Sequence, residues 1–131
     1  MSEQYYQPIQ TELGTLFGRD AVYLDEVDYN FERNILTLIG SINGRLSSSK
    51  TDNWFDYKLI FKGIVAFMNY SIDSWDYSSK SSFDEVVKSD WKKLLNQKVT
   101  STHKHYLLQT YDDVLEIMGG TFTLEITAQK T

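Results

Sequence analysis

The sequence contains no cysteine among its 131 residues. This absence excludes disulfide bonds, iron–sulfur clusters, cysteine nucleophiles and thiolate zinc sites, because each of them needs a sulfur atom. Long apolar runs are also missing, since the longest one extends only from Ile64 to Met68. A helix that crosses a bilayer needs about 20 apolar residues. We therefore expect no membrane-spanning segment.

Basic residues are outnumbered, with 13 Lys and Arg against 18 Asp and Glu, which gives a net charge of -5. Such a chain repels phosphate backbones, so we expect no nucleic-acid partner. Residues Met1 to Tyr6 show no basic segment followed by an apolar one, so we expect no secretory signal and a cytoplasmic location.

Apolar residues make up 41% of the chain and aromatic residues 15%, which is enough to form a packed core. The length suits one domain, so residues 1–131 are expected to form a single unit. Alternation of apolar and polar residues predicts strands, most clearly from Phe55 to Lys62. The predicted strands are 21–29, 35–42, 55–62, 64–68, 103–111, 114–118 and 121–127.

Two helices are predicted beside these strands. A short one lies between Ile9 and Phe17, and the main one extends from Phe83 to Leu95, where apolar residues recur at helical spacing and Trp91 is expected in the core. Short turns between successive strands favour antiparallel pairing. The predicted fold class is α+β, an antiparallel sheet of six or seven strands covered by the main helix, either as a layer or as a partly closed barrel.

Candidate catalytic groups are few. His103 and His105 are two residues apart in a predicted strand and would share one face, so they could supply two nitrogens to a metal ion. Glu26 and Asp28 have the same spacing, which is typical both of an acid–base pair and of a solvated strand face. No Gly-x-Ser-x-Gly motif supports a serine nucleophile. We expect no catalytic set and no cofactor.

Aromatic and acidic residues alternate between Tyr70 and Tyr77, in a predicted loop. Rings interleaved with carboxylates are typical of interaction hot spots for a cationic partner. The alternative is that the rings pack beneath the loop as a small satellite core. The candidate partner-binding residues are Tyr70, Asp73, Trp75, Asp76 and Tyr77.

The segment from His105 to Ile117, followed by Phe122 to Leu124, resembles the closing strands of small bacterial proteins of unknown function, some of them suspected immunity proteins. Leu59 to Ile64 is similar to a central strand in such proteins. The resemblance identifies no catalytic residue. It implies a role in binding another protein.

The leading hypothesis is a non-enzymatic protein-interaction module, in its specific form an immunity-type inhibitor of a basic partner. One alternative is a carrier that binds a small apolar ligand in a pocket lined by Phe55, Tyr57, Phe61 and Phe67. Another is a metal-dependent hydrolase that uses His103 and His105.

Overall fold

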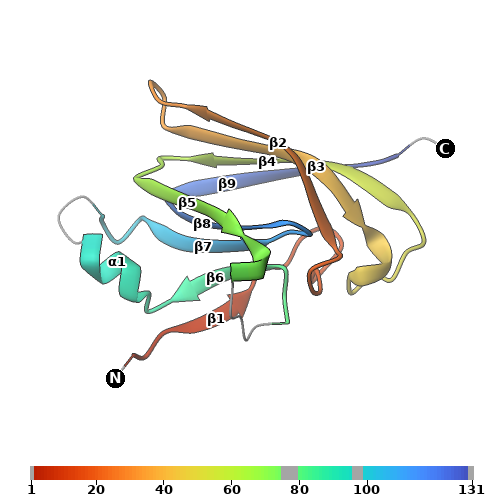
Figure 1. Ribbon diagram of the computed structural model, residues 1–131, viewed down its shortest axis with the longest axis horizontal. Helices are drawn as coiled ribbons and strands as arrows, with labels where there is room; N and C mark the ends of the chain where they lie inside the picture. Colours follow the sequence, from red (N-terminus) through yellow and green to blue (C-terminus); the bar gives the residue numbers. More distant parts are fainter. Residues whose placement is uncertain (1, 75–79, 96–98, 130–131) are drawn as a thin grey trace.

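The computed structural model describes residues 2–74, 80–95 and 99–129. In these segments the chain is mostly β, with nine strands in two antiparallel sheets and a single short α-helix (Figure 1). The two sheets pack against each other, and neither closes on itself to form a barrel. No helix of the described segments is both long and apolar enough to cross a membrane.

The first sheet has five strands in the order β1-β6-β7-β8-β5, and the second has four in the order β2-β3-β4-β9. The strands of the five-stranded sheet are β1 (Tyr5–Pro8), β5 (Ala66–Ser71), β6 (Phe83–Val87), β7 (Lys104–Gln109) and β8 (Asp113–Gly119). Those of the four-stranded sheet are β2 (Val22–Asn30), β3 (Ile35–Asn43), β4 (Trp54–Lys62) and β9 (Thr121–Ala128). The helical elements are η1 (Gly44–Leu46), η2 (Ile72–Ser74) and α1 (Asp90–Leu95).

Three connections carry the chain between the sheets, and two of them, after β4 and after β8, are adjacent bends rich in glycine. Gly63 follows β4 with a positive φ of 68°, a conformation that glycine adopts without steric strain. Gly120 lies between β8 and β9, and its backbone N–H donates to the carbonyl of Lys62 at 2.9 Å. The two crossings therefore support each other, and strands adjacent in sequence are placed in different sheets.

The core lies between the sheets, where Phe61 of β4 meets Phe83 of β6 and Tyr106 of β7, with ring centroids 6.3 and 5.2 Å apart. The predicted alternation in β4 is confirmed, since Tyr57, Leu59 and Phe61 are all buried. Within the described segments, the space enclosed beside Tyr57 is only about 10 Å³. That volume is too small for an organic ligand, and of the four residues expected to line an apolar pocket only Tyr57 borders it.

The predicted main helix is wrong over its first half. Phe83–Val87 is strand β6, paired with β1 on one side and β7 on the other, and only Asp90–Leu95 is helical. Phe83, Val86 and Val87 favour a strand as much as a helix, and the available pairing edges decide the outcome. Lys88 then has a positive φ of 54°, which ends the strand. Trp91 is half-buried rather than fully in the core.

The predicted N-terminal helix is also absent. Residues 9–17 form isolated bridges, Thr11 with Gly14 and Leu16 with Ser47, rather than a helix. Gly14 has a φ of 80°, which an α-helix does not accommodate. The molecule is thus largely β and not an α+β sheet covered by one main helix.

Candidate functional site

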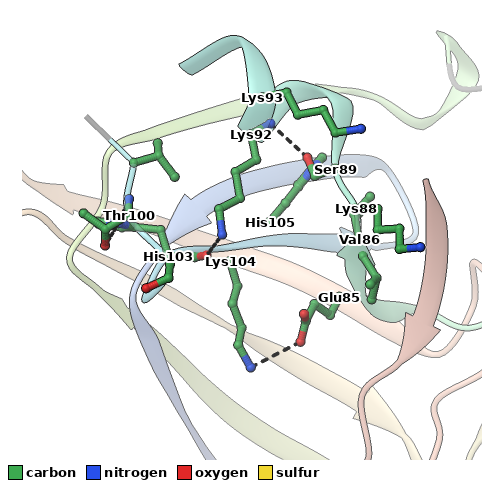
Figure 2. Close-up of a pocket in the computed structure, with 13 residues that line it drawn as sticks. Glu85, Val86, Lys88, Ser89, Lys92, Lys93, Thr100, His103, Lys104 and His105 are labelled. Carbon is green, nitrogen blue, oxygen red and sulfur yellow. Dashed lines mark hydrogen bonds and ion pairs between the residues drawn. The ribbon is translucent and has the colours of Figure 1, made fainter. Parts of the chain in front are cut away.

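A concave pocket of about 470 Å³ lies where β6 ends and β7 begins. It is formed by the connection between these strands, which contains α1 and residues 99–103 (Figure 2). The volume falls within the range of small-molecule sites. It is far larger than the space of about 10 Å³ enclosed beside Tyr57.

The pocket is basic although the whole chain is acidic. Its lining includes Lys88, Lys92, Lys93 and Lys104 against the single carboxylate of Glu85, whereas the chain carries a net charge of -5. We call this site the lysine pocket. Concave surfaces lined by one sign of charge concentrate ions of the opposite sign. The site therefore favours an anionic ligand.

The four lysines differ in how far their charge is compensated. Lys104 pairs with Glu85 at 3.4 Å, and Lys88 pairs with Glu3 at 3.5 Å. The ammonium group of Lys92 donates to the backbone carbonyl of His103 at 2.6 Å, a neutral partner. Lys93 forms no ion pair with any residue that the structure describes. Two positive charges of the pocket thus face no carboxylate.

A chain of hydrogen bonds extends from the pocket wall across the outer face of the five-stranded sheet. Ser89 Oγ lies 2.6 Å from His105 Nδ1, and His105 Nε2 lies 2.8 Å from Glu116 Oε1. The Tyr70 hydroxyl donates to Glu116 Oε2 at 2.7 Å. The four residues come from the turn after β6 and from β7, β8 and β5, which are consecutive neighbours in the sheet. We call them the hydrogen-bond chain.

The protonation of Glu116 orients this chain. Burial raises the pKa of the Glu116 carboxyl, but the hydrogen bonds from His105 and Tyr70 outweigh burial and leave the pKa below its ordinary value. The ionised carboxylate accepts from His105 Nε2–H. In the neutral imidazole this tautomer leaves Nδ1 as the acceptor for the Ser89 hydroxyl. Ser89 Oγ also accepts from the backbone N–H of Lys92 at 3.0 Å, as a helix N-cap does.

The order serine, histidine, carboxylate is that of a general-base relay. Here, however, Ser89 is only 4% exposed and its oxygen already caps α1. These hydrogen bonds satisfy buried polar groups and fix α1 against the sheet. The ring of Trp91 adds to this contact, with its centroid 5.0 Å from that of His105.

The two histidines predicted to share a metal ion point to different partners. His103 precedes β7, and its Nδ1 accepts from the backbone N–H of Thr100 at 3.0 Å. Both ring nitrogens of His105 are engaged by Ser89 and Glu116. The alternation that would align the rings requires both residues to lie in the strand, whereas β7 begins at Lys104. No group of three potential metal ligands occurs among the described residues.

The predicted partner-binding loop is divided. Tyr70 belongs to β5 and its hydroxyl is directed to Glu116, so it contributes to the hydrogen-bond chain. Asp73 lies in η2 with its side chain 82% exposed, 3.8 Å from Arg19. Trp75, Asp76 and Tyr77 lie outside the described residues.

A second surface combines acidic and aromatic residues at the hairpin between β2 and β3, at the margin of the molecule (Figure 1). Residues 25–33 carry four exposed carboxylates, three in β2 and one in the turn, with Arg33 as their single cation. Phe31 is 79% exposed at the turn, the most exposed aromatic ring of the described residues. We call residues 25–33 the acidic hairpin. Its carboxylates are Asp25, Glu26, Asp28 and Glu32.

Sequence reasoning noted acidic residues here but did not choose the hairpin as a site, because alternation with Val27 and Tyr29 is also typical of a solvated strand. The exposure of Phe31 is what distinguishes it. In comparisons with protein-family models, with curated proteins and with solved structures, no match was found.

Proposed function

We propose that this protein is a non-enzymatic protein-interaction module that binds a basic partner through the acidic hairpin. The observation that carries the proposal is Phe31, an aromatic side chain 79% exposed at the turn of a hairpin that carries four exposed carboxylates. Large aromatic residues are frequent anchors of protein interfaces. The Phe31 ring contacts the Tyr29 ring, with centroids 4.6 Å apart, but most of its surface is left in water. That exposed apolar surface is available to a binding partner.

The geometry of β2 supports the same surface. β2 is the terminal strand of its sheet, so one backbone edge carries no strand partner among the described residues. Glu26 and Asp28 pair with Ile39 and Thr37 and therefore project from the outer face of the sheet. Terminal strands attract added strands, and a bulge such as that between Leu24 and Glu26 limits this tendency. The hairpin thus presents its side chains to a partner, rather than a long regular backbone edge to which another strand could pair.

Charge indicates the type of partner. The hairpin carries four carboxylates and one guanidinium, on a chain of net charge -5. This charge accelerates association with a basic surface and disfavours association with an acidic surface. An inhibitor of the immunity type is the specific form of this proposal that the resemblance supports. Raising the salt concentration should then lower the association rate more than it raises the dissociation rate.

The experiment is a pull-down from the native host followed by binding kinetics with the captured protein. Tagged wild type, Phe31→Ala, and Asp28→Lys combined with Glu32→Lys are compared. Leu94→Ala is the matched control, because Leu94 is an apolar side chain 83% exposed on α1. We expect Phe31→Ala to weaken binding about 30-fold, as for an interface anchor, and Leu94→Ala to leave it unchanged. Equal capture by wild type and both hairpin variants, or no specific partner, would contradict the proposal.

A further inference from the structure

We propose that the lysine pocket is a binding site for a small ligand carrying a multiply charged oxyanion, either phosphoryl or polycarboxylate. The site is separate from the acidic hairpin and does not depend on the function proposed for it. It rests on the charge, the room and the fixed geometry of the residues between β6 and β7.

The charge is arranged to be available to a ligand. Lys92 extends from α1 across the pocket toward His103, as Figure 2 shows, and its hydrogen bond there leaves the positive charge uncancelled. Lys93 has no ion pair among the described residues. Both residues line the pocket, so an oxyanion bound there is attracted by their positive charges.

The chemistry of the lining selects for charge rather than for a planar group. Lysine supplies point charges, whereas the flat, two-pronged recognition of a carboxylate is a property of arginine. The described residues that line the pocket include no arginine. Affinity in such a site should therefore increase with the charge of the ligand, and acetate should bind far more weakly than pyrophosphate or citrate.

The pocket has room for more than the anionic group. A volume of about 470 Å³ exceeds that of a single phosphate, and Val86, Val87 and Val99 contribute apolar lining. Sites of this size bind small organic molecules by combining apolar contact with a few polar groups. The ligand class is thus a small molecule with a multiply charged end.

The walls are held in place before a ligand arrives. Ser89 and His105 are bound within the hydrogen-bond chain, which fixes the turn after β6 against β7. On the other side, Thr100 contacts His103 Nδ1 through its backbone N–H at 3.0 Å and its hydroxyl at 3.1 Å. A preformed site loses less conformational entropy on binding. Both features favour a binding site over an incidental hollow.

The test is a titration of the purified full chain with pyrophosphate, citrate and acetate at physiological salt, followed by amide NMR and calorimetry. We expect pyrophosphate or citrate to bind with a Kd below about 1 mM, and the shifted amides to lie between residues 85 and 105. Whichever of the two binds more tightly identifies the ligand as phosphoryl or polycarboxylate. Acetate should give no saturable shift.

Two double variants distinguish the pocket from general electrostatics. Lys92→Gln with Lys93→Gln removes the two uncompensated charges, and Lys58→Gln with Lys62→Gln removes the same charge from exposed positions of β4. We expect at least about a 10-fold loss of affinity for the first and less than about 2-fold for the second. Lys93→Gln alone, at a side chain without an ion pair, should already weaken binding.

The proposal would be overturned by any of three results. These are no saturable binding of pyrophosphate or citrate below about 10 mM, an equal loss in the β4 variant, and shifted amides that lie outside the pocket. None of these results depends on the acidic hairpin, so failure here and failure of the proposed function are distinguishable.

Discussion

Glu116 is the residue on which the hydrogen-bond chain depends, so Glu116→Ala is the substitution that tests it most directly. The carboxylate accepts from His105 at 2.8 Å and from Tyr70 at 2.7 Å, and its side chain is 16% exposed. Alanine removes the Glu116 acceptor of a buried imidazole N–H and of the half-buried Tyr70 hydroxyl. Each such group costs about 1–3 kcal/mol. We therefore expect a loss of roughly 3–5 kcal/mol in the free energy of unfolding, comparable to breaking a buried pair.

The assay is urea unfolding at neutral pH, followed by the fluorescence of the three tryptophans. Glu125→Ala is the matched control, because Glu125 is exposed in β9, and a change within about 0.5 kcal/mol is expected there. If Glu116→Ala lost less than about 1 kcal/mol, the hydrogen-bond chain would contribute little to stability. The account of how α1 is held would then be wrong.

The same substitution should change how stability depends on pH. The pKa of Glu116 lies below its ordinary value of 4.5, because the hydrogen bonds from His105 and Tyr70 outweigh the effect of burial, which by itself raises it. A depressed folded pKa gives stability that is present above the unfolded pKa and is lost as the pH falls through the folded one. Wild type should therefore lose stability on acidification from about pH 5 downward, and Glu116→Ala should lose less over that range.

Two further substitutions test the packing. Gly40→Ala would place a Cβ atom 1.8 Å from the carbonyl oxygen of Tyr23, so we expect a loss above about 3 kcal/mol, or no folded protein, by urea unfolding and circular dichroism. A mild effect would mean that β2 and β3 are not paired in this register. Trp91→Ala removes a half-buried ring that contacts His105, so we expect it to lower the free energy of unfolding by about 1–2 kcal/mol. Phe83→Ala removes a fully buried ring and should lower it by roughly 3–5 kcal/mol. Equal losses for the two rings would place Trp91 in the core after all.

Most strands could be predicted because one face of each is buried and the other is exposed to solvent. In β9, Phe122, Leu124 and Ile126 are half-buried while the threonines and Glu125 between them are exposed, as the period of two predicts. The same rule located β3 and β4. It depends only on local pattern, so it holds wherever a strand of the sandwich has a solvated outer face.

The rule fails for β6, where both faces are covered and the period disappears. In Phe83–Val87 the buried residues include Asp84. In this strand, therefore, the polarity of a residue does not predict whether its side chain is buried or exposed. Ser82 and Glu85 have capping-box spacing, and the apolar residues also recur at helical intervals. What decides the conformation is pairing with β1 and β7, which comes from segments far away in the sequence.

The candidate sites were harder to find than the strands for the same reason. His105 was noticed in the sequence through its neighbour His103, whereas its actual partners, Ser89 and Glu116, come from the turn after β6 and from β8. Only the strand order brings them together. A usable signal was present, since Glu116 is a charged residue flanked on both sides by buried apolar ones, a position where a carboxylate needs a partner.

The two surfaces have opposite charge, and this makes salt a means of separating the two proposals. At the acidic hairpin the local carboxylates and the net charge of -5 have the same sign, so long-range attraction and contact both favour a basic partner. At the lysine pocket they oppose each other, because the chain repels the anion that the pocket attracts. Screening at physiological salt limits exposed charges to about 8 Å, which removes the distant repulsion while the nearby lysines still act. Association at the hairpin should therefore weaken more steeply with salt than oxyanion binding in the pocket.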